Sequence, residues 1–191
     1  MNSTVYDLAL KPLELTGLKK LRAELLSHAQ GKTLEIGIGS GLNLSYYPED
    51  VQLTGIEPDP SMRKKSLKRS KNINVKVEDG DAMALAFPDY EFDTVVGTLV
   101  FCTIADPQKA IKEVYRVLRP GGTFLLLEHV RRNGPLIGPL LDKLTPIWVH
   151  IADGCHLNRD PSHFITSAGF KTIEFKEFWK GLGKFWILKK P

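Results

Sequence analysis

Residues 34–41 read Leu34-Glu35-Ile36-Gly37-Ile38-Gly39-Ser40-Gly41, an apolar strand that runs into three glycines at alternate positions. Glycine lacks a Cβ, so this backbone can turn tightly and approach a ligand closely. The next predicted strand ends in Glu57, twenty residues after Gly37, and a carboxylate at that spacing can accept the hydroxyl protons of a ribose. The segment therefore predicts a site for a ribose-bearing ligand at the end of a buried strand.

Two common nucleotide-binding patterns are absent from this stretch. The dinucleotide fingerprint needs a glycine at the position that Leu42 holds. A phosphate-binding Walker loop needs a Gly-Lys-Ser/Thr step, which does not follow these glycines. Both departures weigh against an NAD-dependent oxidoreductase and against hydrolysis of a nucleoside triphosphate. For the loop taken alone, a simple turn stays the alternative.

The overall composition is that of a globular protein. The chain has 191 residues, of which 42% are hydrophobic and 25% charged, which suits one domain over residues 1–191. Cys102 and Cys155 are too few and too far apart for a disulfide framework or a CxxC unit, so we expect a cytoplasmic location. The first ten residues do not resemble a signal peptide, and no apolar run approaches the roughly 20 residues that span a bilayer.

Much of the net charge of +4 comes from one basic stretch, residues 63–71. Such a stretch can attract phosphate groups, but no aromatic residues are interleaved to stack on bases. We therefore expect a solvated helix face and no nucleic acid partner. Weak peripheral contact with an anionic membrane is left open, and no obligate protein partner is inferred.

Apolar runs alternate with helical periodicity along the chain, which predicts the α/β class with a parallel sheet. Each strand is almost continuously apolar, as burial on both faces of a sheet requires. Parallel strands are expected at residues 32–36, 51–57, 73–78, 92–101 and 123–130, and an antiparallel hairpin at 170–178 and 183–189. Helices are expected at 16–29, after Asp59-Pro60, from Asp106-Pro107 to the turn at 119–122, at 136–151 with proline kinks, and from Asp160-Pro161 to Gly169.

Four segments in this order resemble the motifs of class I S-adenosylmethionine (SAM)-dependent methyltransferases. They are the glycine loop, Glu57, Gly80-Asp81-Ala82 and the turn Val117-Leu118-Arg119-Pro120-Gly121-Gly122. The resemblance implies a Rossmann-like, seven-stranded sheet in the order 3-2-1-4-5-7-6, with the last strand antiparallel, and SAM as cofactor. It further implies that SAM is bound by Glu35, Gly37, Gly39, Gly41, Glu57, Pro58, Asp81, Ala82 and Thr98.

A closer resemblance extends over most of the chain. Residues 97–102, 127–130 and 153–159 are similar to small methyltransferase-like proteins whose mammalian members are membrane-anchored alkyl-thiol S-methyltransferases. More loosely, the core resembles bacterial phospholipid and quinone methyltransferases. The resemblance implies methyl transfer to a small-molecule acceptor, first a thiol, then an amine or a phospholipid headgroup. The alternative is a non-catalytic SAM-binding module that acts through a protein or an anionic partner.

A thiol acceptor reacts best as its thiolate, which requires a base or a lowered pKa. His129, after the fifth strand, and Asp153, in a polar insertion, are the predicted catalytic residues; a structural histidine and a turn aspartate are their alternatives. The spacing of His150, His156 and His163 fits no standard ligand pattern, so no metal is expected. Phe101, Trp148 and Tyr6 are candidates to line an apolar pocket, and Cys155 is expected to be inert.

Overall fold

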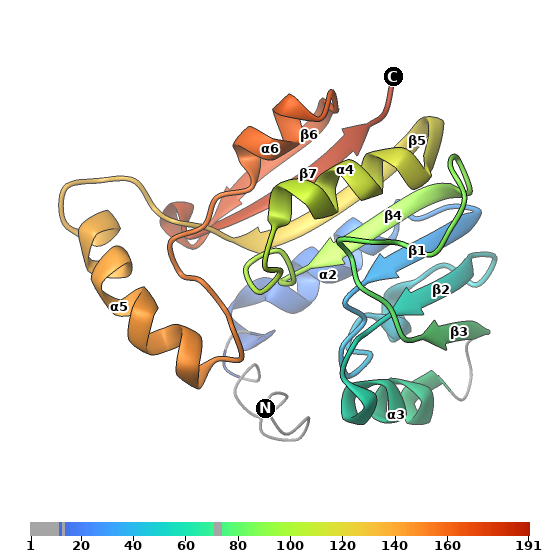
Figure 1. Cartoon of the computed structure of the whole chain (residues 1–191), viewed down its shortest axis with the longest axis horizontal. Helices are drawn as coiled ribbons and strands as arrows, with labels where there is room; N and C mark the ends of the chain where they lie inside the picture. The colour runs from blue at the N-terminus through green and yellow to red at the C-terminus, as the bar shows by residue number, and fades with distance from the viewer. Residues whose placement is uncertain (1–11, 13, 71–73) are drawn as a thin grey trace.

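A seven-stranded sheet forms the centre of the structure, a computed structural model that describes residues 12, 14–70 and 74–191 (Figure 1). Its strand order is β3-β2-β1-β4-β5-β7-β6, with β7 antiparallel to both neighbours and the remaining pairs parallel. The predicted class and strand order are therefore confirmed. The strands are β1 (Lys32–Ile36), β2 (Gln52–Ile56), β3 (Val75–Glu78), β4 (Phe92–Thr98), β5 (Leu118–His129), β6 (Lys171–Phe178) and β7 (Gly183–Lys189).

Two strand limits differ from the prediction for physical reasons. β4 ends at Thr98 instead of residue 101, because Leu99 has a φ of 53° and turns the chain away from the sheet. β5 begins at Leu118 instead of residue 123, because Leu118 pairs with Phe92 before the glycine turn and regular pairing resumes at Thr123. The beginning predicted for β3, Ile73, lies outside the described residues.

Helices begin where the sequence places capping residues. Asp59 accepts hydrogen bonds from the first turn of α3 (Pro60–Arg69), and Asp106 does the same for α4 (Pro107–Val117). The remaining helices are α2 (Lys19–Leu26), α5 (Ile137–Ile151) and α6 (Ser162–Ser167), with short helical turns at Glu14–Leu18, Leu44–Tyr46 and Trp179–Gly181. The helix predicted at 16–29 was too long, because Gly17 has a φ of 101° and breaks it from the preceding turn.

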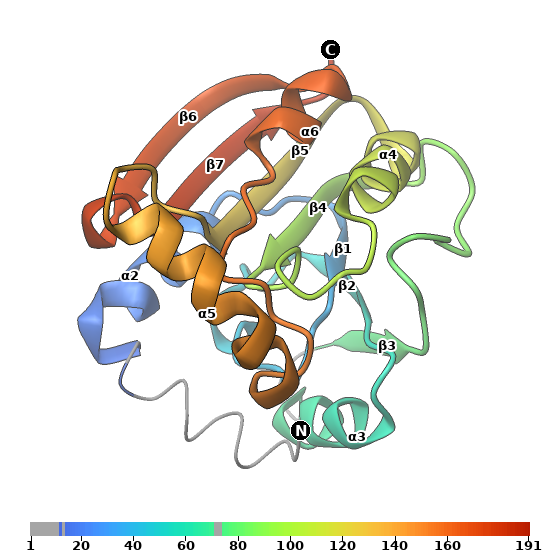
Figure 2. The same ribbon diagram turned by 60° about the vertical axis from the view of Figure 1, so that its left-hand side comes forward.

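Alternate residues of each inner strand pack on opposite faces of the sheet. On β5, Phe124 and Leu126 join the core under α4 and α6, whereas Leu125 and Leu127 join the core under α2. Figure 2 shows α2 on one side of the sheet and α4 and α6 on the other. Both faces of the central strands are therefore buried, as their continuous apolar runs predicted.

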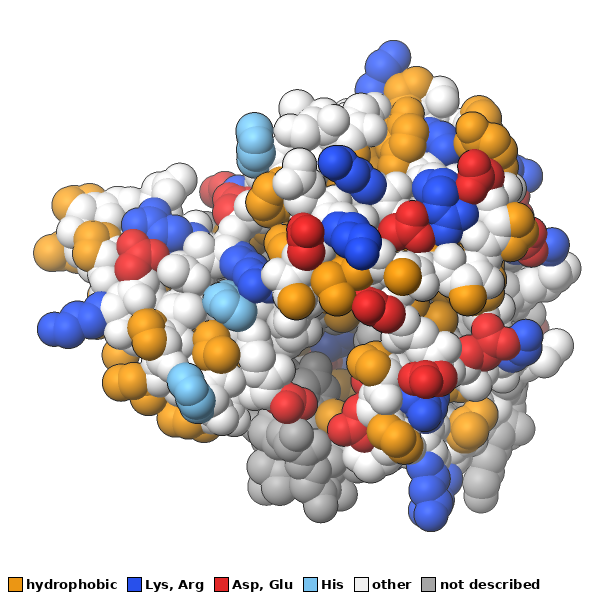
Figure 3. Space-filling view, viewed as in Figure 1, with side chains coloured by type: hydrophobic (Ala, Val, Ile, Leu, Met, Phe, Trp, Pro, Cys, Tyr) orange, Lys and Arg blue, Asp and Glu red, His pale blue; other side chains and the backbone are white. Residues whose placement is uncertain are grey.

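α5 stands apart from the layers, beyond the carboxyl ends of the parallel strands (Figures 1 and 2). It exposes Leu140, Leu144, Ile147, Trp148 and Ile151. In Figure 3 the surface is hollowed between the lobe that contains α5 and the body of the sheet. The described residues form no helix that is long and apolar enough to cross a membrane.

A buried lysine joins the end of the chain to the end of α4. Lys190 is 5% exposed, and its Nζ donates to the carbonyls of Tyr115 (2.6 Å) and Leu118 (2.7 Å). The ammonium also lies 4.3 Å and 4.5 Å from the ring centroids of Tyr90 and Tyr115. Burial lowers the pKa of Lys190, and the carbonyls of the last helical turn offset that cost.

We expect Lys190→Met to lower the free energy of unfolding by about 2–4 kcal/mol, because two buried carbonyls lose their donor. Denaturant unfolding of the variant measures this loss. Lys171→Met, at the exposed beginning of β6, removes the same charge as a matched control and should change stability little. Equal losses in both variants would contradict the prediction.

Candidate functional site

The three glycines of the loop after β1 all adopt left-handed backbone conformations, at φ 63°, 55° and 82°. A Cβ on Gly37 would lie 2.4 Å from Val100, so the loop packs directly on the turn after β4. Among the described residues, a Cβ on Gly39 would meet only the Gly37 carbonyl, at 3.8 Å. These residues therefore leave the space above Gly39 open, and a side chain there would fill it.

Glu57, at the end of β2, is attached to this loop. Its Oε2 accepts from the Gly39 N–H and its Oε1 from the Asp59 N–H, both at 3.0 Å. Burial raises the pKa of Glu57, against the lowering effect of the two N–H donors. The carboxylate borders the open space above Gly39, where its remaining lone pairs can accept hydroxyl protons. Binding of a ribose by Glu57 stays a prediction of the sequence.

A buried polar network lies beneath the loop. Oε1 of Glu35 accepts from Asn43 Nδ2 (2.6 Å) and Oε2 accepts from the Tyr47 hydroxyl (2.9 Å). Thr98 Oγ1 accepts from Asn43 (2.8 Å) and from Arg22 (3.0 Å). Burial raises the pKa of Glu35 to about 7, against the lowering effects of its hydrogen bonds and of Arg22. Glu35 and Thr98, predicted to bind the cofactor, thus use their side chains to support the loop.

The other predicted cofactor residues lie along the same edge of the sheet. Pro58 is exposed after β2, and Ala82 is buried after β3. Asp81 is exposed, and its Oδ1 accepts from the Met83 N–H at 2.8 Å. The ends of β1, β2 and β3 therefore bring the glycines, Glu57 and Asp81 to one edge.

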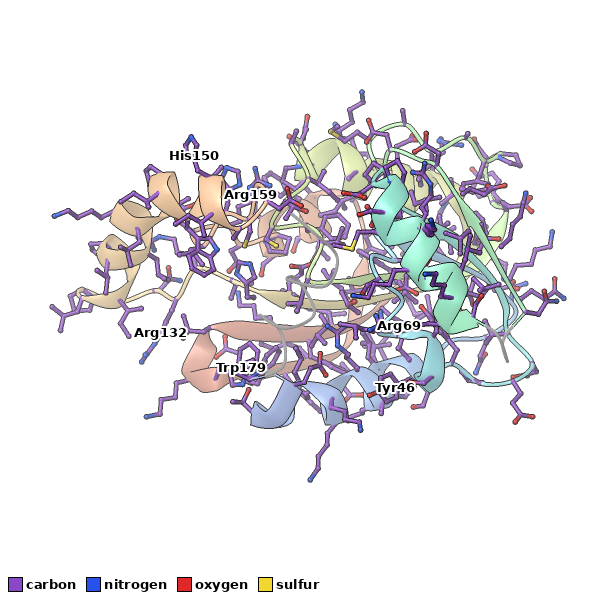
Figure 4. All side chains as sticks on the ribbon, turned by 90° about the horizontal axis from the view of Figure 1, so that it is seen from below. Tyr46, Arg69, Arg132, His150, Arg159 and Trp179 are labelled. Carbon is purple, nitrogen blue, oxygen red and sulfur yellow. The ribbon has the colours of Figure 1, made fainter. Side chains whose placement is uncertain are left out.

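The basic helix α3 is not merely a solvated face. Arg63 donates to the carbonyls of Glu57 and Pro58 and to Asp79. Arg69 donates to the carbonyl and to the hydroxyl of Ser40, both at 2.7 Å. Figure 4 shows Arg69 on α3. Arg69 therefore holds the glycine loop, and Arg63 holds the segment that follows β2. Lys71 lies outside the described residues.

The turn after β4 is organised by a buried carboxylate from β5. Oε1 of Glu128 accepts from the N–H groups of Val100 (2.7 Å) and Phe101 (2.9 Å). Burial raises the pKa of Glu128 to about 7, against the effects of His129 and of these two donors. Arg159 donates to the carbonyls of Phe101 and Cys102, both at 3.2 Å. The residues after β4 are thus held from both sides.

His129 lies beside two cysteine thiols at this end of the sheet. Its Nε2 is 3.1 Å from the Sγ of Cys155. A hydrogen bond from Cys102, together with those from His129 and Trp148, lowers the pKa of Cys155 to about 4, although burial opposes the shift. Burial lowers the pKa of His129, but Cys155 and Glu128 outweigh it, and the net direction is upward. Contact between the two side chains therefore lowers the pKa of the Cys155 thiol and raises that of the His129 imidazole.

The structure places the remaining predicted residues less favourably. Asp153 is exposed at a φ of 54°, in the turn that ends α5. Phe101 is buried in the core, Trp148 is 41% exposed on α5, and Tyr6 lies outside the described residues. Among the described residues, the histidines of the insertion do not appear in a group with metal-ligand geometry.

The sequence does not indicate that Cys102 and Cys155 lie together beside His129. From the sequence Cys155 is expected to be inert, because no activating neighbour is near it there. The neighbours arrive from the turn after β4 and from the end of β5. No spacing pattern could have shown this, because the fold alone brings the three segments together.

The chain is similar to known methyltransferases. A methyltransferase domain model matches residues 34–126. The thiol S-methyltransferase TMT1B of rat is 35% identical over 150 residues, which are 75% of this chain. The match spans only 61% of the length of the rat protein. Human TMT1B is 32% identical over 182 residues, 87% of this chain and 74% of the human protein. A SAM-dependent methyltransferase structure from Thermotoga maritima superimposes with a TM-score of 0.76 at 22% identity, covering 98% of this chain and 96% of the other.

The raised pKa of Glu35 predicts how stability changes with pH. The folded state binds a proton near pH 7 that the unfolded chain releases near 4.5, so stability falls as pH rises from about 4.5 to 7. We expect Glu35→Gln to remove this dependence, so that the variant gains roughly 2–3 kcal/mol relative to the native protein between pH 5 and pH 8. Urea unfolding at several pH values measures the difference.

Glu49→Gln is the matched control, because it makes the same change at a carboxylate that is exposed. A Glu35→Gln profile that runs parallel to that of the native protein would show that Glu35 does not titrate in this range.

Proposed function

Because the chain belongs to the SAM-dependent methyltransferase family, we propose that it transfers the methyl group of SAM to the sulfur of a small thiol. The observation that carries the proposal is the shared edge of the sheet, where the open loop at Gly39 and the Cys155–His129 pair both lie. In this proposal the loop at Gly39 holds the methyl donor, and the Cys155–His129 pair accepts the proton of the thiol. The thiol S-methyltransferase relatives support the choice of sulfur.

In this proposal the residues at the ends of β1, β2 and β3 would hold SAM. Gly37, Gly39 and Gly41 give its backbone-lined cradle, and Glu57 accepts the ribose hydroxyls. Pro58, Asp81 and Ala82 border the adenine. Glu35 and Thr98 act beneath the loop, through Asn43.

The acceptor enters where β4 and β5 end. His129 and Cys155 share one proton in this region, beside the exposed apolar residues of α5. An apolar thiol suits this surface, because its chain can pack on Trp148 while its sulfur meets the polar pair. Asp153, exposed in the adjacent turn, is the second candidate to assist deprotonation.

The chain's chemical task is mainly one of positioning. The bond between the methyl carbon and the sulfonium sulfur breaks as the acceptor sulfur attacks in line, and S-adenosylhomocysteine leaves as a neutral thioether. Holding two reactants in line can supply roughly 7–11 kcal/mol. The protein must also remove the thiol proton, because a free thiol with a pKa near 8.5 is only a few per cent thiolate at neutral pH.

We expect Gly39→Val to abolish binding of S-adenosylhomocysteine, because the side chain fills the open space. Glu57→Gln should weaken binding by roughly 10- to 100-fold, as charge-assisted hydrogen bonds are lost. Isothermal calorimetry measures both, with NADH as the ligand that should not bind.

Gly121→Val is the matched control for the backbone strain. Gly121 has a φ of 73° and no atom within 4 Å of its Cβ position, at the amino end of β5. Similar losses in both valine variants, or tighter binding of NADH, would place the cofactor elsewhere.

Turnover on labelled SAM with thiols, amines, phenols and phospholipids tests the acceptor. We expect a thiol to be methylated and His129→Gln to slow that reaction most near pH 7 and least near pH 9, where solvent removes the thiol proton. Affinity for S-adenosylhomocysteine should not change. Asp153→Asn tests the second candidate in the same way.

A loss of rate that is independent of pH would mean that His129 only shapes the pocket. Transfer to an amine or a headgroup alone would overturn the choice of sulfur. Binding of SAM without transfer to any acceptor would favour a non-catalytic binding module.

A further inference from the structure

We propose that Cys102, His129 and Cys155 form a binding site for one thiophilic divalent cation, Zn²⁺. Thiolate and imidazole are the ligands that zinc prefers in proteins. The inference does not depend on the proposed function, because it rests on side-chain geometry and is tested without SAM or acceptor. It departs from the sequence-based expectation of no metal, which considered the spacing of His150, His156 and His163 and not that of His129.

The ligand atoms are already close enough to share an ion. The two Sγ atoms and the nearest ring nitrogen of His129 all lie within 4.8 Å of one another, and Nε2 is 3.1 Å from Cys155 Sγ. In tetrahedral zinc sites, bond lengths of about 2.3 Å to sulfur and 2.1 Å to nitrogen place ligand atoms roughly 3.6–3.8 Å apart. Side-chain shifts of about 1 Å would therefore complete the site.

Each ligand comes from a different, firmly held segment. Cys102 follows β4, and its carbonyl accepts from the His156 N–H (2.9 Å) and from Arg159 (3.2 Å). His129 ends β5. Cys155 follows the turn that closes α5, where its N–H donates to the Ala152 carbonyl at 3.0 Å. Figure 4 shows Arg159 where the α5 lobe meets the sheet. Such support outside the ligands is what metal sites require.

A small cavity offers the fourth coordination position. It has a volume of about 10 Å³ and is lined by Cys102, His129 and Glu128, together with Phe101, Arg159 and Phe164. This volume holds about one water molecule. Three protein ligands and one water form the coordination of catalytic zinc sites.

Glu128 gives the independent observation that points to this water. Its Oε2 is the one buried side-chain nitrogen or oxygen among the described residues that has no hydrogen-bond partner. A carboxylate oxygen left unpaired in the interior costs free energy, so it requires an explanation. A metal-bound water in the adjoining cavity would donate to Oε2 and satisfy it.

A Cys102–Cys155 disulfide is the competing use of the two thiols. A disulfide would explain neither the contact between His129 and Cys155 nor the buried oxygen of Glu128 that has no hydrogen-bond partner. The cation accounts for all four side chains. Two thiolates balance the charge of Zn²⁺.

Cobalt substitution tests the site on the full chain. The reduced, chelator-treated protein is titrated with Co²⁺ and then with Zn²⁺. We expect one equivalent of Co²⁺ to give a thiolate-to-cobalt charge-transfer band and the intense visible bands of a four-coordinate ion, and Zn²⁺ to abolish both. The chain has only two cysteines, so a thiolate band assigns Cys102 or Cys155 even if no variant folds.

Ligand variants then identify the three residues. Cys102→Ser, Cys155→Ser and His129→Gln should each weaken Zn²⁺ binding at least 100-fold in a competition titration. His150→Gln, on the exposed face of α5, is the matched control and should bind as the native protein does. Zinc should also raise the thermal midpoint of the native protein but not that of Cys155→Ser.

Three results would overturn the proposal. They are a cobalt spectrum without thiolate bands, zinc affinity that the three ligand variants do not change, and a Cys102–Cys155 disulfide that persists in reductant. Zinc bound to His129 would occupy the ring nitrogen that the proposed function uses as a base, so methyl transfer is measured on the chelator-treated protein. Failure of the metal site and failure of the proposed function are then distinguishable.

Discussion

Burial of carboxylates at the carboxyl edge of the sheet is the constraint on which the candidate site depends. Glu35 of β1, Glu57 after β2 and Glu128 of β5 are each buried, and each accepts hydrogen bonds from a neighbouring loop. A carboxylate left in the interior without hydrogen bonds destabilises the fold by several kcal/mol. Movement of a loop away from its carboxylate would therefore be unfavourable. The site is therefore shaped by acidic residues that the sheet itself carries.

In the proposed function these attachments divide the edge into a donor half and an acceptor half. In the donor half, Glu57 holds the glycine loop, and Arg63 and Arg69 hold the end of β2 and that loop from α3. In the acceptor half, Glu128 and Arg159 hold the turn that carries Cys102. The halves meet where Gly37 packs against Val100, so a side chain at position 37 would clash with the turn after β4.

The segment from α5 to Arg159 distinguishes this chain from a bare sheet with its covering helices. It exposes an apolar helix surface and returns Cys155 and Arg159 to the ends of β4 and β5. A polar pair beside an apolar surface suits an acceptor with a hydrocarbon body and one reactive sulfur. In the proposed function, this segment therefore selects the acceptor.

The sequence by itself determined the fold class, the glycine loop and the helix beginnings at Asp59 and Asp106, because these depend on local periodicity, capping and short motifs. The strand order was implied only by the resemblance to a known family, and the structure confirms it. The sequence did not determine where β4 ends, since the turn at Leu99 is held by Glu128 from another strand. Only the tertiary structure placed Cys155 beside His129 and turned an expected inert cysteine into an activated one. A pKa depends on the neighbours that folding supplies, and residues far apart in the chain leave no local pattern to read.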